Sequence, residues 1–260
     1  MLGAIAGDII GSVYERFPLK TKSFPLFHPG GTFTDDTVLT VAIAEALLEG
    51  EPYSPALRRW ARRYPDAGYG ASFLLWMRAD SEGAYGSWGN GSAMRVSPVG
   101  WAFEDLEETL AEAARSAAVT HDHPQGIQGA EATALAIFLA RHGVGQEELR
   151  TDLGEMFLYD LDRTLDEIRP HYTFDVSCQG SVPESILAFL ESENWEDSVR
   201  LAVSLGGDSD TMAAIAGSLA EAFYGGVPEE VVREVERRLP REMWQVVEAF
   251  NDRFPTPDLP

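Results

Sequence analysis

Residues 34–49 read TDDTVLTVAIAEALLE, and this stretch carries much of the information about the fold. A threonine and two aspartates open it, and the residues from Val38 to Ala44 bear no charge. Because apolar side chains cover nearly every side of the expected helix, it belongs in the centre of the protein rather than on the surface. Residues 130–140, AEATALAIFLA, have the same character. Two such helices predict a core made by helix packing.

The rest of the chain repeats this helical character. Most segments between glycines and prolines place apolar residues at i, i+3 and i+4, and strictly alternating runs are scarce. Two helix starts carry explicit signals: Pro183 takes an expected first-turn position after Ser181, and Asn194 precedes a helix that begins at Trp195. We expect a single all-α domain over residues 1–260. The predicted helices are residues 2–15, 35–49, 54–63, 71–77, 104–119, 124–141, 146–156, 182–191, 195–205, 211–223, 228–238 and 241–250.

Composition narrows the class of protein. A formal net charge of -22 over 260 residues disfavours nucleic acids and anionic membranes as general partners. An anionic substrate must therefore be bound locally, by metals, helix N-termini or a few placed donors. Cys178 is the only cysteine, which excludes an intramolecular disulfide and a thiolate zinc cluster and favours the cytoplasm. No apolar stretch approaches the roughly 20 residues of a membrane helix.

The first helix carries two patterns. Gly3, Gly7 and Gly11 recur at four-residue spacing, which permits close approach of another helix at about 1 kcal/mol of helix propensity per glycine. Asp8 and Glu15 lie on another face of the same segment. We interpret Asp8 as a hydrogen-bonded structural carboxylate and Glu15 as the better candidate for chemistry.

Two aspartate-rich boxes each follow a Gly-Gly turn and each open an apolar helix. They are TDDT at residues 34–37 and GGDSDT at residues 206–211. Neighbouring carboxylates repel one another, so a positive group is expected beside them. For either box alone, a helix cap with one solvated aspartate explains the pattern about as well. For both together, carboxylate and hydroxyl oxygens favour hard cations such as Mg²⁺, and with Glu15 they suffice for two ions that share ligands.

Two further stretches suit a ligand. Residues 85–95, YGSWGNGSAMR, form a glycine-rich loop of the kind that closes on phosphate oxygens, with Trp88 available to stack on a base or ribose. The alternative is an ordinary tight connection between helices. Residues 120–124, THDHP, place two histidines at a helix junction, and we expect His121 to contact a ligand while the other histidine is structural.

Taken in order, these motifs resemble the ADP-ribosylglycohydrolase family, which includes the dinitrogenase reductase-activating glycohydrolase. The matching stretches are GDIIGSVYE at residues 7–15, TDDT, GNGSAMR at residues 89–95, THDHP and GGDSDT. The resemblance implies an orthogonal bundle of helices around a cleft with a binuclear Mg²⁺ or Mn²⁺ site. The implied metal ligands are Thr34, Asp35, Asp36, Asp208, Asp210 and Thr211. The implied substrate-binding residues are Gly70, Gly86, Ser87, Trp88, Gly89, Asn90 and His121.

The resemblance further implies metal-dependent hydrolysis of the glycosidic bond between ADP-ribose and an attached group, on a modified protein or a small conjugate. The implied general acid/base is Glu15, Asp35 or Asp36. The sequence does not decide among the three, because the choice depends on distances to the leaving atom. Two alternatives stay open: a non-catalytic ADP-ribose-binding protein, and another Mg²⁺-dependent enzyme acting on a diphosphate. The leaving group, the native metal, the oligomeric state and the role of residues 172–181 are left open by the sequence.

Overall fold

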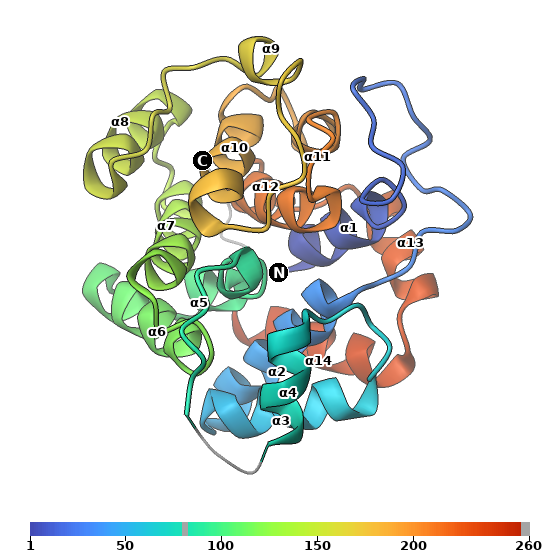
Figure 1. The fold of residues 1–260 in the computed structure, drawn as a ribbon, viewed down its shortest axis with the longest axis vertical. Helices are drawn as coiled ribbons and strands as arrows, with labels where there is room; N and C mark the ends of the chain where they lie inside the picture. Colours follow the sequence, from blue (N-terminus) through green and yellow to red (C-terminus); the bar gives the residue numbers. More distant parts are fainter. Residues whose placement is uncertain (80–82, 256–260) are drawn as a thin grey trace.

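The computed structural model describes residues 1–79 and 83–255 (Figure 1). This part of the chain contains fourteen α-helices, one short 3-10 helix and a single isolated β-bridge between Gly89 and Ser177. The predicted all-α fold class is therefore confirmed. Within the same residues, no helix combines the length and the apolar character that crossing a membrane requires.

Most predicted helices are present, with ends displaced by a few residues. Both ends of the predicted helices at residues 35–49 and 124–141 are confirmed. The elements are α1 Leu2–Gly11, α2 Asp35–Glu49, α3 Tyr53–Arg63, α4 Ala71–Arg78, η1 Asn90–Ser92, α5 Ser97–Ala102, α6 Leu106–Ala118, α7 Pro124–Arg141, α8 Gln146–Phe157, α9 Leu165–Ile168, α10 Cys178–Leu190, α11 Trp195–Val203, α12 Ser209–Phe223, α13 Glu229–Arg238 and α14 Arg241–Arg253. The sequence pattern missed η1, α5 and α9, which are too short to show a helical period.

Two predicted boundaries were wrong in ways that affect the site. Helix α10 begins at Cys178, where Ser177 is the N-cap and accepts from Gly180 N, so Pro183 lies inside the helix. A proline there removes one backbone hydrogen bond, and the buried α10 side chains on both sides of it outweigh that loss. Helix α1 ends at Gly11, and Glu15 therefore stands in the turn that follows.

Helices α1 and α12 form the central pair, and they lie side by side in Figure 1. All ten residues of α1 are buried. The predicted glycine stripe is the contact surface: a Cβ on Gly3 would stand 2.1 Å from Gly217 O, and one on Gly7 would stand 2.1 Å from Ala213 O. Only glycine permits the two backbones to approach so closely, which brings the ends of α1 and α12 together.

Helices α2 and α7 are central as the sequence predicted. Leu39 and Ile43 of α2 and Leu135 and Ile137 of α7 are fully buried in one hydrophobic cluster. Helix α2 begins at the N-cap Thr34 and ends at Gly50, whose left-handed φ of 66° is the usual stop signal. The core therefore holds the beginning of α2 next to the α1–α12 pair.

Candidate functional site

A cavity of about 750 Å³ opens where these helices meet. Its walls come from the turn after α1, the beginning of α2, the beginning of α4, the residues around η1, the junction of α6 and α7, the segment before α10 and the beginning of α12. The large cavity thus collects residues from seven places along the chain. Both aspartate boxes contribute to it, through Asp35 and Asp36 on one side and Asp208 and Asp210 on the other.

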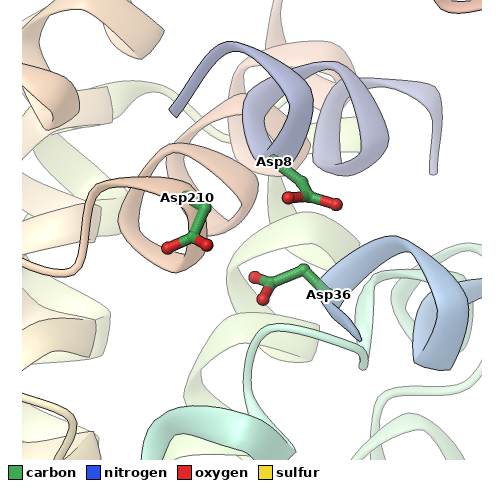
Figure 2. Close-up of side chains that lie close together, drawn as sticks. All are labelled: Asp8, Asp36 and Asp210. Atoms are coloured by element: carbon green, nitrogen blue, oxygen red, sulfur yellow. The ribbon is translucent and has the colours of Figure 1, made fainter. Parts of the chain in front are cut away.

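Three carboxylates meet beside the cavity, and two of them, Asp36 and Asp210, line it. Asp8 of α1, Asp36 of α2 and Asp210 of α12 each offer an oxygen within 4.8 Å of the others. Figure 2 shows the three side chains pointing toward one another from their separate helices. All three are buried. The close α1–α12 contact puts Asp8 and Asp210 side by side, and the beginning of α2 adds Asp36.

A second group of three carboxylates adjoins the first and shares one member with it. Glu15, Asp208 and Asp210 offer oxygens within 4.8 Å of one another, and Glu15 is only partly buried. Asp210 therefore belongs to both groups. The sequence placed Glu15 and the two α12 aspartates in one site, and the structure brings them together.

The predicted helix cap exists, but the aspartates of the TDDT box do not provide it. Thr34 caps α2 by accepting from Asp36 N. Asp8 accepts from Thr34 N at 2.9 Å, Thr34 Oγ1 at 2.8 Å and Thr37 N at 3.1 Å, and from Thr37 Oγ1 as well. Asp8 is thus hydrogen-bonded, as the sequence interpretation held. Asp36 Oδ1, by contrast, is buried and has no hydrogen-bond partner among the described residues.

Burial and mutual repulsion make this cluster resist ionisation. Burial, followed by the charge of Asp210, raises the pKa of Asp8 to about 7. The same two causes, in the same order, raise the pKa values of Asp36 and Asp208 well above the usual range of an aspartate. Burial and then Asp210 also raise the pKa of Glu15, and Arg16 opposes them. A bound cation would remove the repulsion that raises these pKa values.

Three predicted metal ligands, Thr34, Thr211 and Asp35, belong to neither group of three carboxylates. Thr211 Oγ1 donates to Asp36 Oδ2 at 3.3 Å, and Thr34 Oγ1 donates to the same oxygen at 3.3 Å. Asp35 lines the cavity beside the Gly68 turn but belongs to neither group of three. Its pKa is raised well above the usual range, first by burial and then by Asp210. The ligand roles predicted for Thr34, Asp35 and Thr211 remain predictions.

The glycine-rich loop also lines the cavity. Ser87, Gly89 and Asn90 line the cavity, as do Gly70 and His121, whereas Gly86 and Trp88 lie outside the lining. Trp88 is 48% exposed. The substrate contacts predicted for Gly86 and Trp88 stay predictions that the cavity does not support directly.

The loop is more closely tied to the protein than its sequence indicated. Asn90 Nδ2 donates to Asp208 Oδ2 at 2.8 Å, so this side chain orients a carboxylate of the acidic cluster. Asn90 N donates to Val176 O, and Gly86 N donates to Asp122 Oδ1 at 2.7 Å. Ser87 Oγ accepts from Gly89 N. Several loop N–H groups thus already have protein acceptors.

The two histidines of the THDHP motif have different surroundings, and the ligand contact expected for His121 stays a prediction. His121 is 5% exposed and lines the cavity, and burial, with Arg95 as a second cause, lowers its pKa well below the usual range. His123 is the N-cap of α7, and its side chain accepts from Gln125 N. Because His121 is buried with so low a pKa, its ring is neutral at physiological pH.

Residues 172–181, whose role the sequence left open, supply a wall of the cavity. Phe174 and Val176 line it although they are 53% and 47% exposed. The isolated bridge between Gly89 and Ser177 joins this segment to the glycine-rich loop. No pattern in the sequence marks Phe174 as a site residue, because the pairing that places it is tertiary. Arg95, also absent from the predicted set, lines the cavity behind the loop.

The comparisons with known proteins give the class of this all-helical protein, whose two carboxylate groups share Asp210: it is a hydrolase that acts on ADP-ribose glycosidic bonds. The model of the ADP-ribosylglycohydrolase family matches residues 1–259, and the chain belongs to that family. It is 30% identical to the ADP-ribosylhydrolase ARH3 of Mus musculus, with 88% of this chain and 84% of that protein covered. It is 26% identical to the ADP-ribosylarginine hydrolase Tri1 of Pseudomonas putida, with 99% of this chain and 78% of that protein covered.

The fold is also that of a solved member of the same family. A structure described as an ADP-ribosylglycohydrolase-related protein complex superposes with a TM-score of 0.74 at 27% sequence identity. The superposition covers 97% of this chain and 96% of that one. The family resemblance drawn from the ordered motifs is thereby confirmed.

Proposed function

We propose that this protein hydrolyses the glycosidic bond between ADP-ribose and an attached group, with two divalent cations, Mg²⁺ or Mn²⁺, held by the acidic cluster. Two groups of three carboxylates share Asp210, which lines the cavity, and this observation carries the proposal. A shared carboxylate is the arrangement expected for two neighbouring cations. The ADP-ribose moiety is supported by the relatives, both of which are named as hydrolases of ADP-ribosyl groups.

The residues present fit hard cations. Asp36 Oδ1 is a buried acceptor without a donor, and a cation would satisfy it. The donor set is made of carboxylate oxygens, which Mg²⁺ and Mn²⁺ prefer. Asp36 and Asp210 would hold one ion with Asp8 close by, and Asp208, Asp210 and Glu15 would hold or border the other. Asp8 already accepts several hydrogen bonds, so its main task is to orient Thr34 and the beginning of α2.

When bound, the two ions would orient the distal ribose and lower the pKa of a water molecule. The chain itself supplies the rest. Asn90 Nδ2 donates to Asp208 and orients it, and Thr211 Oγ1 donates to Asp36 and orients it. Of the three acid/base candidates, Glu15 suits the leaving group best, because it is the least buried and stands in a turn at the cavity wall. Its carboxyl oxygen would hold the proton that the leaving group takes up.

Release of ADP-ribose from synthetic peptides tests the proposal. One peptide carries ADP-ribose on serine and one on arginine, and each is incubated with Mg²⁺, with Mn²⁺ and with a chelator. We expect release in the presence of metal and loss of release after chelation. Asp210→Asn is expected to lower the rate by at least about 10³-fold, since it alters both carboxylate groups. Asp162→Asn is the matched control, because Asp162 is exposed and outside the cavity lining.

The results separate the proposal from its alternatives. Tight binding of ADP-ribose without turnover of either peptide would favour a non-catalytic binding protein. Metal-independent release would overturn the assigned role of the carboxylates. Absence of both binding and turnover would favour a different diphosphate substrate for the same cavity.

A further inference from the structure

Arg95 is a buried cation at the cavity wall that the mechanism above does not use. It is fully buried, and it follows the glycine-rich loop and contributes to the cavity wall. Its Nη2 donates to Thr120 Oγ1 at 2.7 Å and to Ser116 O at 3.0 Å. Its Nε and Nη1 have no hydrogen-bond partner among the described residues. A buried guanidinium without full pairing is costly to the fold, which points to a role.

The contact with Thr120 extends to His121. Thr120 Oγ1 lies 2.7 Å from His121 Nδ1. A guanidinium can only donate, so the threonine oxygen accepts from Arg95 Nη2. The single hydroxyl hydrogen of Thr120 is then available for Nδ1, and in that arrangement His121 Nδ1 is the acceptor. Because the buried ring is neutral and carries one proton, that proton is on Nε2.

His121 Nε2 faces the glycine-rich loop at the cavity. A Cβ placed on Gly91 would stand 3.1 Å from Nε2, and one placed on Gly89 would stand 3.8 Å from it. Gly89, Gly91 and His121 all line the cavity. The loop's own N–H groups at Gly86, Gly89 and Asn90 already donate to protein acceptors. Because these backbone N–H groups are already used, an anionic ligand at this wall benefits from a side-chain N–H that donates to it.

We propose that Arg95 is a positioning residue that acts through Thr120 to hold His121 as a neutral ring with its proton on Nε2, ready to donate to a diphosphate oxygen of the substrate. The assignment of the ligand rests on the proposed function, whereas the relay is a property of the ligand-free protein. The Arg95 guanidinium, whose Nε and Nη1 have no hydrogen-bond partner among the described residues, also provides local positive charge in a protein whose net charge is -22. That charge helps to bind a diphosphate against the overall field.

The tautomer of His121 tests the relay without substrate. Long-range ¹H–¹⁵N correlation spectra of the ligand-free protein identify the protonated ring nitrogen, with His121→Asn used to assign the signals. We expect the Nε2–H form in the wild type and in Thr120→Ser, which keeps the hydroxyl. Thr120→Val, which has nearly the same shape but no hydroxyl, is expected to show loss of that single form. A proton on Nδ1 in the wild type, or an unchanged spectrum in Thr120→Val, would overturn the relay.

Binding then tests the assigned ligand. Calorimetric titration with ADP-ribose should show affinity lowered about fivefold to tenfold by Thr120→Val and by His121→Ala, and near normal for Thr120→Ser. If Thr120 acts through His121, Thr120→Val should add nothing in the His121→Ala background. Additive losses would contradict the relay. If the wild type shows the expected tautomer but does not bind ADP-ribose, the result contradicts the proposed function and the diphosphate assignment. It does not contradict the relay.

Arg95 itself is tested by Arg95→Lys and Arg95→Met. Lysine keeps the charge and a donor, and methionine keeps only the length. We expect Arg95→Met to disturb the His121 tautomer and Arg95→Lys to restore part of it. If Arg95→Met unfolds the protein, Thr120→Val still decides the question. A folded Arg95→Met protein with the wild-type tautomer would show that Arg95 has no positioning role.

Discussion

Gly7 of α1 packs against the backbone of Ala213 in α12, so that a Cβ on Gly7 would stand 2.1 Å from Ala213 O and 2.4 Å from Ala213 C. This contact sets the spacing of the two helices that carry Asp8 and Asp210. Close packing of the helices and assembly of the acidic cluster are therefore the same structural event.

Gly7→Ala should destabilise the protein by about 3 kcal/mol, because the new methyl group meets backbone atoms that cannot move without separating α1 from α12. Urea unfolding measures the change. Gly83→Ala is the control, since no atom of the described residues lies within 4 Å of its Cβ position, and its effect should be near zero. Equal stability of both variants would show that α1 and α12 can separate freely.

Removing the shared carboxylate should stabilise the metal-free protein while abolishing its response to metal. After burial, the charge of Asp210 is the next largest cause of the raised pKa values of Asp8, Asp36 and Asp208. In chelator, we expect Asp210→Asn to be more stable than the wild type by roughly 1 kcal/mol. Added Mg²⁺ or Mn²⁺ should raise the Tm of the wild type and leave that of the variant unchanged. An equal rise in both proteins would place the metal elsewhere.

The stability of the metal-free protein should fall as the pH rises. The folded-state pKa of Asp8 is about 7, above its ordinary value of 3.8, and the pKa values of Asp36 and Asp208 are raised as well. Between the unfolded-state and the folded-state pKa values of these aspartates, the folded protein therefore binds more protons than the unfolded chain. Its free energy of unfolding declines as the pH increases through that window. Urea unfolding in chelator near pH 5 and near pH 8 measures the slope.

Asp210→Asn should reduce this slope, because it removes a source of the raised pKa values. Bound cations should reduce it too. A metal-free wild type that is more stable near pH 8 than near pH 5 would mean that the cluster is ionised without strain.

Phe174 should contribute to ligand affinity through its place in the cavity wall. Phe174→Ala is expected to weaken binding of ADP-ribose by about fivefold to tenfold through lost apolar contact. Leu75→Ala is the control, since Leu75 is also an exposed apolar residue, 71% exposed, and lies outside the cavity lining. Similar affinities for the two variants would assign residues 172–181 a purely structural role.

Local chemistry made several features readable from the sequence. The unbroken apolar surface of residues 35–49 and the threonine before it predicted a central helix with the bounds that the structure shows. Asn194 was likewise a readable start for α11, because an asparagine side chain can cap a helix, and it accepts from Asp197 N in the structure. The start of α10 was misread at Pro183, since a local rule about proline was overridden by the burial of α10 in the core.

The sequence by itself determined the all-α fold class, the glycine stripe of α1 and which acidic residues are candidates for the site. Each of these features depends on residues that are near neighbours in the chain. Only the tertiary structure decided that Asp210 belongs to two groups of carboxylates and that Thr34 rather than an aspartate caps α2. It alone placed Phe174 and Arg95 at the cavity. These relationships arise between residues far apart along the chain, and their geometry is set by how closely the helices pack rather than by any local pattern.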